Sequence, residues 1–101
     1  MKVIVSPEAM RRFRESLSIY RTYMTRREVA KRVAEVKTIL RYIGDHPGYG
    51  AYEDLLAIPE DGIRYRRAIA GKFKIIYRMV HRTIQVSGIF DARQHPRRMK
   101  G

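Results

Sequence analysis

Residues 63–91, IRYRRAIAGKFKIIYRMVHRTIQVSGIFD, decide the fold class. Apolar and polar side chains alternate along this segment, and two turn-like pairs, Gly71-Lys72 and His81-Arg82, interrupt the alternation. A period of two is typical of β-strands, and two-residue interruptions are typical of hairpin turns. The segment therefore predicts three antiparallel strands. They cover Ile63–Ala70, Phe73–Val80 and Thr83–Phe90.

The alternation also predicts where charge lies on these strands. Phe73 falls on one face of the middle strand, and Lys74 and Arg78 fall on the other, because successive side chains point to opposite faces. Arg64 and Arg66 share one face of the preceding strand. We expect the cations of both strands to form a common surface, with the opposite face of the sheet packed.

Two helices are predicted ahead of the strands. After a short β-branched run at 2–5, Ser6-Pro7-Glu8 has the chemistry of a helix start: a capping hydroxyl, a proline and an acidic first turn. Thr25-Arg26-Arg27-Glu28 matches a capping box and starts a second helix. Apolar residues then recur at helical spacing from Phe13 to Met24 and from Val29 to Ile43.

The segment 46–62 predicts a connection, because it contains three glycines and two prolines. We expect Leu55, Leu56 and Ile58 to anchor it to the core. Residues 1–101 are then a single α+β domain, with an N-terminal strand and a helical hairpin packed on a small C-terminal antiparallel sheet.

Positive charge is concentrated in the C-terminal part of the chain. The net charge is +12; residues 1–62 carry eleven Lys and Arg against nine Asp and Glu, and residues 63–101 carry eleven against Asp91 alone. Such an excess attracts nucleic acids and acidic proteins. The alternative is a solvated surface that maintains solubility. We expect the partner surface to be C-terminal.

Several classes of function are excluded at this stage. There is no cysteine, no apolar signal peptide at the N-terminus and no stretch long enough to span a bilayer, so a cytoplasmic protein without membrane contact is expected. His46, His81 and His95 are scattered, and no glycine-rich phosphate loop or Ser/His/Asp arrangement is present. We expect no metal and no cofactor. RNA cleavage by a cationic site stays open, because Arg and Lys stabilise a pentavalent phosphate without any acidic residue.

Residues 66–78, RRAIAGKFKIIYR, and 84–96, IQVSGIFDARQHP, resemble the RelE/ParE superfamily of type II toxins. The shared pattern is an Arg, a short basic or glycine turn, an aromatic–basic–aliphatic–aliphatic–Tyr strand, and a last strand closing in an Arg-rich segment before a Pro. The order of a leading strand, a helical hairpin, a loop and a terminal sheet is similar too. The resemblance implies a growth inhibitor neutralised by a cognate antitoxin whose acidic segment folds on binding.

The superfamily has two branches, and the resemblance favours the ParE-like one, whose members poison DNA gyrase and are not nucleases. RelE-like members cleave mRNA on the ribosome and carry a C-terminal Tyr or His. After Pro96 this chain has neither, which leaves His95 as the only candidate for proton transfer. A third possibility is a nontoxic nucleic-acid-binding module or a decayed toxin.

Each branch implies its own site. The ParE-like branch implies target-binding cations at Arg64, Arg66, Lys74, Arg78, Arg93, Arg97 and Arg98. In the RelE-like alternative, the scissile phosphate and its protons are handled by Arg66, Lys74, Arg93 and His95, with Arg67 as an alternative to Arg66.

Overall fold

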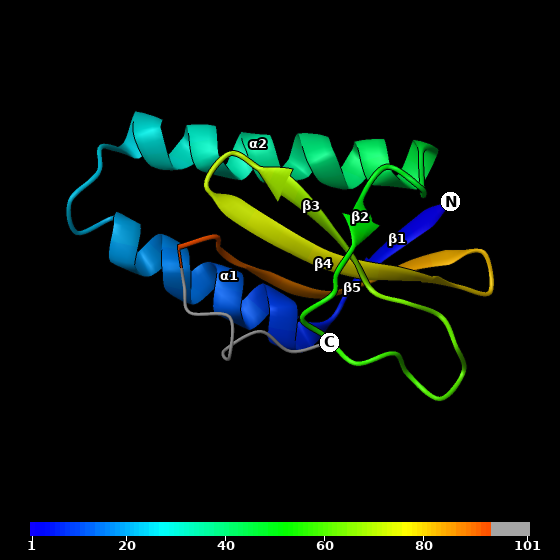
Figure 1. Ribbon diagram of the computed structural model, residues 1–101. Coiled ribbons are helices and arrows are strands. Elements are labelled where there is room, and N and C mark those ends of the chain that lie inside the picture. The colour runs from blue at the N-terminus through cyan, green and yellow to red at the C-terminus, as the bar shows by residue number, and fades with distance from the viewer. Residues whose placement is uncertain (94–101) are drawn as a thin grey trace.

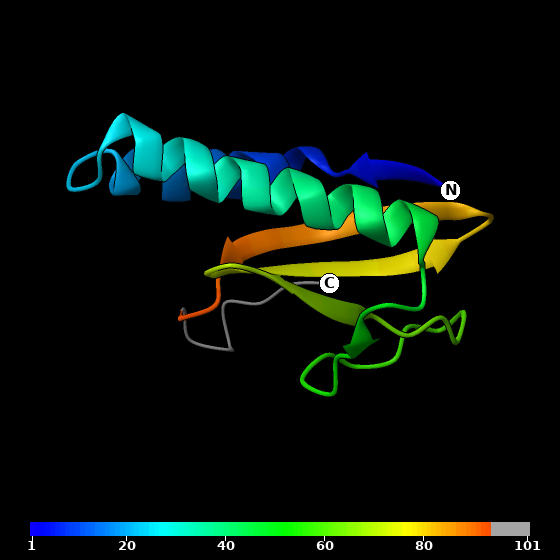
Figure 2. The ribbon, with the colours of Figure 1, turned by 90° about the horizontal axis from the view of Figure 1, so that it is seen from above.

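The computed structural model describes residues 1–93 and shows an α+β fold in which two helices cover one face of a five-stranded mixed sheet (Figures 1 and 2). The elements in chain order are β1 Lys2–Val5, α1 Pro7–Tyr20, α2 Arg26–Asp45, β2 Ala51–Tyr52, β3 Arg66–Ala70, β4 Phe73–Val80 and β5 Thr83–Asp91.

The three predicted C-terminal strands form an antiparallel meander within a sheet of order β1-β5-β4-β3-β2. The predicted bounds of β4 are confirmed, and β5 continues one residue further, to Asp91. β3 begins at Arg66 and not at Ile63. The reason is that the chain leaves β4 there, and the Tyr65 carbonyl accepts a hydrogen bond from the amide of Glu53 in the preceding loop, at 2.9 Å.

The expected architecture is wrong in one respect: the N-terminal strand is part of the sheet and does not pack on it from outside. β1 pairs in parallel with β5, from Lys2 opposite Thr83 to Val5 opposite Val86, so the sheet is mixed and not purely antiparallel. Parallel pairing requires a long crossover between strands, and the two helices and the meander supply it. The short strand β2 at the opposite edge was not predicted either.

Both helix starts form as predicted. The Ser6 hydroxyl accepts a hydrogen bond from the amide of Ala9 at 3.0 Å, and the Thr25 hydroxyl accepts one from the amide of Glu28 at 3.1 Å. α1 ends at Tyr20, so Met24 lies in the turn between the helices and not on α1.

The main core lies between the helices and the helix-facing side of the sheet. Phe13 of α1 meets Phe73 of β4 edge to face, with ring centroids 5.1 Å apart. A bulge at Ser87 of β5 lets Val86 and Ile89 both face this core. The buried residues of the core are Ala9, Phe13, Leu17, Tyr20, Val29, Val36, Ile43, Ala68, Ala70, Phe73, Ile75, Tyr77, Ile84, Val86 and Ile89.

The other face of the sheet, here called the open face, is partly covered by the loop between β2 and β3. Ile76 and Phe90 are buried there beneath Leu56 and Tyr65. The expected anchoring by Leu55 and Ile58 is wrong, since both side chains are 62% exposed. One leucine and one tyrosine suffice to cover this small apolar area, and their neighbours in the loop face water.

Candidate functional site

The predicted cations of β3 and β4 do not share one surface. Arg66 pairs directly with Tyr77, which is buried on the helix-facing side, whereas Lys74 pairs with Ile69 on the open face. Directly opposed residues of two strands point to the same face. The two-residue turn pairs Ala70 with Phe73, so even-numbered residues of β3 accompany odd-numbered residues of β4. The expected grouping of Arg66 with Lys74 is therefore wrong.

Lys74 forms an ion pair that is largely shielded from solvent. Its Nζ lies 2.6 Å from Oε2 of Glu53, and the two side chains are 16% and 3% exposed. Burial raises the pKa of Glu53, but the hydrogen bonds from Lys74 and from the Leu55 amide outweigh it, so the pKa lies below its usual value. The charge of Lys74 is compensated within the fold.

Arg78 and Arg64 also have carboxylate partners in the loop before β3. Arg78 Nη1 lies 2.8 Å from Oδ2 of Asp61, and Arg64 Nη2 lies 3.2 Å from Oδ1 of Asp54. The Ile63 amide and the Arg78 guanidinium together hold the pKa of the Asp61 carboxyl below its usual value. The loop thus neutralises part of the positive charge that the C-terminal segment carries in sequence.

Arg93 lies at the other end of the sheet, against the end of α1. Its guanidinium bonds Oδ2 of Asp91 at 2.7 Å and the Tyr20 hydroxyl at 3.3 Å, while that hydroxyl donates to Asp91. The bond from Arg93 lowers the pKa of Asp91, although burial opposes it. Burial and the bond to Asp91 raise the pKa of Tyr20 to about 12. With Tyr23, these residues line a hollow of about 250 Å³.

Arg66 is the exception among the candidate cations of residues 1–93, because its partners are neutral. Its Nη1 donates to the carbonyls of Gly50 at 2.7 Å and Gly48 at 3.4 Å, and its Nη2 donates to the Tyr52 hydroxyl at 3.1 Å. Its guanidinium carbon lies 4.2 Å from the centre of the Tyr52 ring. Within residues 1–93 no carboxylate pairs with Arg66, so its charge is not compensated by an ion pair.

The cations that the nuclease alternative requires do not lie close together in the described part of the chain. Lys74 lies opposite Ile69, and Ile69 is three residues from Arg66 along β3. The two cations are therefore separated by about 10 Å along the strand and point to opposite faces of the sheet. Arg93 packs against α1. The remaining candidates, His95, Arg97 and Arg98, lie outside the described residues.

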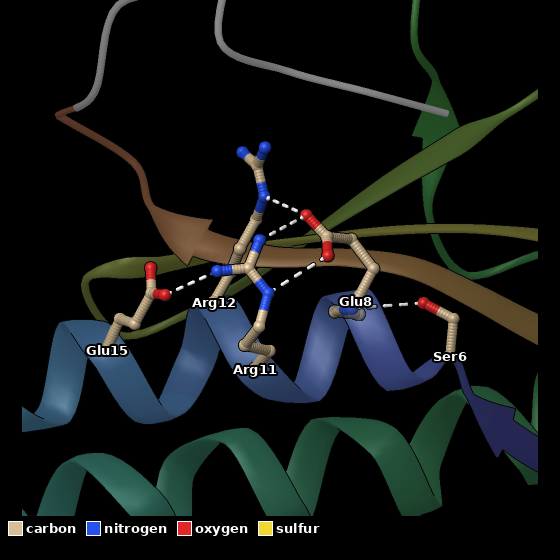
Figure 3. Close-up of polar contacts among 6 residues, drawn as sticks. Ser6, Glu8, Arg11, Arg12 and Glu15 are labelled. Carbon is tan, nitrogen blue, oxygen red and sulfur yellow. Dashed lines mark hydrogen bonds and ion pairs between the residues drawn. The ribbon is translucent and has the colours of Figure 1, made fainter.

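The two carboxylates of α1 pair with arginines of the same helix (Figure 3). Glu8 bonds Arg11 at 2.7 Å and Arg12 at 2.9 Å, and Arg11 also pairs with Glu15. The bonds from Arg11 and Arg12 lower the pKa of Glu8 to about 2. These contacts are local helix pairs with a modest effect on stability.

A groove beside α2 was missed by sequence reasoning. It encloses about 770 Å³ where α1 ends and α2 begins, and Lys37 connects it to a second hollow of about 670 Å³ next to β1. The signal in the sequence was Ala30 and Ala34, whose small side chains at helical spacing leave room beside Val33. The groove is lined by Arg21, Met24, Arg26, Val29, Ala30, Val33, Ala34 and Lys37.

No family model matches the chain, and no curated protein matches it either. In residues 1–93, no helix is long and apolar enough to cross a membrane, and no three His, Cys, Asp or Glu side chains gather as metal ligands would.

Proposed function

We propose that this chain is the toxin of a type II toxin–antitoxin pair, on the ParE-like side of the RelE/ParE superfamily, and that it inhibits DNA gyrase. The order of its elements supports the proposal: a leading strand, two helices, a loop rich in proline and glycine, and terminal antiparallel strands. This is the order that the sequence resemblance implies for the superfamily.

The ParE-like branch is preferred because Arg66 and Lys74 are separated in space. A cationic nuclease site needs guanidinium and ammonium groups directed at one phosphate, because electrostatic stabilisation depends on preorganised contacts about 3 Å from the charge that develops. Arg66 and Lys74 lie on opposite faces of the sheet. Arg67, the alternative to Arg66, shares the open face with Lys74. The Glu53 carboxylate, however, lies 3.9 Å from Arg67 and 2.6 Å from Lys74, where it offsets both charges. Inhibition by binding requires no such convergence.

The groove beside α2 is the candidate binding site of the antitoxin. Its floor is apolar at Val29 and Val33, and Arg21, Arg26 and Lys37 contribute positive charge to its lining. An amphipathic helix with acidic flanks matches both features, since its apolar face fills the groove and its carboxylates meet the cations. We therefore assign the acidic, folding-on-binding segment of the antitoxin to this groove.

The first test is pulse labelling after induced expression without an antitoxin, which follows DNA and protein synthesis over the first minutes. DNA synthesis is expected to stall first, and the purified protein is expected to block supercoiling of relaxed plasmid by gyrase. Early arrest of protein synthesis with cleaved mRNA supports the RelE-like alternative and contradicts the proposal. No arrest of either synthesis identifies a nontoxic or decayed module.

Two substitutions distinguish the branches further. Lys74→Met and His95→Ala remove groups that the nuclease alternative needs for chemistry. The ParE-like branch also implied Lys74 as a target contact, but Glu53 compensates its charge and its side chain is only 16% exposed, so toxicity is expected to persist in both variants. Arg93→Ala is expected to lower toxicity, because the Arg93 side chain is 63% exposed and can contact a target. Arg27→Ala removes an equal charge from the exposed start of α2 and serves as the control. Loss of toxicity in a folded Lys74→Met variant would favour cleavage.

A further inference from the structure

Three of the most exposed tyrosines belong to the end of α2 and the segment that leads from it into β2, whose course Figure 1 shows. Tyr42, Tyr49 and Tyr52 are 43%, 50% and 43% exposed, whereas Tyr20 and Tyr77 are in the core. A single exposed aromatic residue is ordinary in a soluble protein, but a contiguous group indicates a binding surface. We call this group the aromatic surface. It comprises Tyr42, His46, Tyr49, Tyr52, Arg64 and Arg66.

Contacts between the rings hold this surface in one arrangement. The His46 ring stacks on Tyr42 with centroids 4.2 Å apart and an angle of 19°, and Tyr49 meets Tyr42 edge to face at 4.9 Å. The amide of Tyr49 donates to the His46 carbonyl at 2.9 Å. These ring planes are therefore set before any ligand arrives, which lowers the entropy cost of binding.

Arg66 contacts the chain around Tyr49 and the hydroxyl of Tyr52, and part of its guanidinium has no hydrogen-bond partner in the described residues. It bonds the carbonyls of Gly48 and Gly50, on either side of Tyr49, and it bonds the hydroxyl of Tyr52. Within residues 1–93, Nε and one hydrogen of Nη2 have no partner. The guanidinium therefore keeps N–H groups that a phosphate oxygen can accept from.

We propose that the aromatic surface binds unpaired nucleotides of a single-stranded nucleic acid, with bases stacked on Tyr49 and on the Tyr42–His46 pair and a phosphate on Arg66. The guanidinium groups of Arg64 and Arg66 already lie over the Tyr52 ring, 4.1 and 4.2 Å from its centre. Stacking on aromatic side chains next to cations is the usual means by which proteins hold single strands, because every base presents a π-face. A duplex keeps its bases stacked inside and offers only phosphates to this surface. Arg64 and Arg66 also belong to the target-binding cations implied for a gyrase inhibitor, whereas Tyr42, His46, Tyr49 and Tyr52 do not, so substitutions of the rings separate this site from gyrase inhibition.

The charge of the aromatic surface favours a nucleic acid over an acidic protein. Asp54 already pairs with Arg64, and Arg66 is the cation here without a carboxylate in the described residues. A single uncompensated guanidinium next to several rings matches one phosphate per few bases, whereas an acidic segment requires several free cations. The net charge of +12 adds a general attraction for the strand.

The test is fluorescence anisotropy of a labelled twelve-nucleotide strand titrated with the full-length protein. Three probes are compared at equal salt: single-stranded DNA, single-stranded RNA of the same sequence, and the corresponding blunt DNA duplex. Both single strands are expected to bind more tightly than the duplex. A preference between DNA and RNA identifies the natural source of the strand. Duplex binding that equals single-strand binding reports charge alone and overturns the proposal.

Substitutions of the rings and of Arg66 test their contributions separately. Tyr49→Leu is expected to weaken single-strand binding roughly ten-fold, and Tyr49→Trp to retain it. Tyr23→Leu is the matched control, because Tyr23 is 61% exposed and also has an edge-to-face neighbour, in Tyr20. Arg66→Gln is expected to lower the salt dependence by about one phosphate, with Arg27→Gln as the control for lost charge.

Both ring variants concern exposed side chains, so circular dichroism is expected to be unchanged in them. Equal affinity of Tyr49→Leu and Tyr23→Leu for the single strand overturns the proposal. If the aromatic surface serves a protein partner instead, no single strand binds in preference to the duplex, and Tyr49→Leu changes neither affinity. The Tyr49→Trp variant adds a direct reading, since the chain has no other tryptophan and stacking of a base quenches indole fluorescence.

Discussion

Glu53 and Lys74 form an ion pair of 2.6 Å in which the Glu53 side chain is 3% and the Lys74 side chain 16% exposed. Glu53 follows the edge strand β2 and Lys74 lies in the middle of the sheet, so the pair fastens the loop before β3 to the open face. Breaking a buried pair by removing one partner is costly, because the other charge is left without compensation.

Lys74→Met is accordingly expected to lower the free energy of unfolding by about 2 kcal/mol, less than for a fully enclosed charge. Urea denaturation measures the loss. Lys72→Met, at the exposed turn two residues earlier, is the control and is expected to change stability little. An equal effect of both substitutions would show that the ion pair contributes nothing. In the double variant Lys74→Met/Glu53→Gln, part of the lost stability should return.

Stability at alkaline pH should depend on Tyr20. Its pKa is raised to about 12, because it is buried and donates to Asp91, while the unfolded chain ionises near the ordinary value of 10. Below pH 10 this contribution is fully present, and it is lost as pH rises through 12. Tyr20→Phe should therefore show a shallower decline between pH 10 and 12. A parallel decline in both proteins would contradict the assigned pKa.

Stability at acid pH should depend on Asp91. The bond from Arg93 lowers its folded-state pKa, so its contribution is present above the unfolded value near 4 and is lost as pH falls below it. Denaturation between pH 6 and pH 2 should show the wild-type protein losing roughly 2 kcal/mol through this group. Asp91→Asn is expected to be less stable at pH 6 and to converge with the wild type at low pH. A constant difference would rule out the linkage.

The aromatic surface should depend on a buried hydroxyl beneath it. Tyr77 accepts a hydrogen bond from the Gly50 amide and donates to the Pro47 carbonyl, both at 2.8 Å. Tyr77→Phe leaves the buried Gly50 amide without a partner, which costs about 1–2 kcal/mol. Hydrogen exchange should accelerate at the Gly50 amide before it changes in β4. Uniform acceleration throughout the sheet would mean that Tyr77 supports the whole core and not this segment.

Local chemistry explains which parts of the fold could be predicted. Ser6 and Thr25 cap their helices through the hydroxyls that mark them in the sequence, and Gly71 takes a positive φ of 62° at the predicted hairpin turn. β1 was identified as a strand, but its parallel pairing with β5 depends on a contact about eighty residues away in sequence, which local patterns do not report.

The candidate site was harder to predict than the fold, because the position of a charge in the sequence does not show which charges lie next to it in space. Asp54 and Asp61 lie in the N-terminal part by number but next to Arg64 and Arg78 in space. Arg66 was assigned to the face of Lys74 by alternation within each strand, and only the register across the turn shows otherwise. The groove beside Ala30 depends on how two helices diverge, which no residue of either helix encodes alone.

Neutralisation by the antitoxin should depend on the groove and toxicity should not. Ala30→Glu introduces a carboxylate among Arg21, Arg26 and Lys37, where it fills space and repels an acidic segment. Position 30 is exposed on α2 and four residues after Arg26, so the helix tolerates the change. We expect the variant to inhibit growth as before, while its affinity for the antitoxin falls about ten-fold or more, measured by titration calorimetry.

Ser18→Glu places the same carboxylate on the exposed side of α1, away from the groove, and is the control for added charge. Co-expression with the antitoxin should rescue growth in the Ser18→Glu variant and fail in the Ala30→Glu variant. Rescue of both at equal antitoxin levels would move the antitoxin to another surface, while loss of toxicity in Ala30→Glu alone would make the groove part of the target contact. Toxicity and neutralisation can be separated in this way because the target binds another surface of the toxin. The toxin therefore stays active when only the antitoxin is kept from binding.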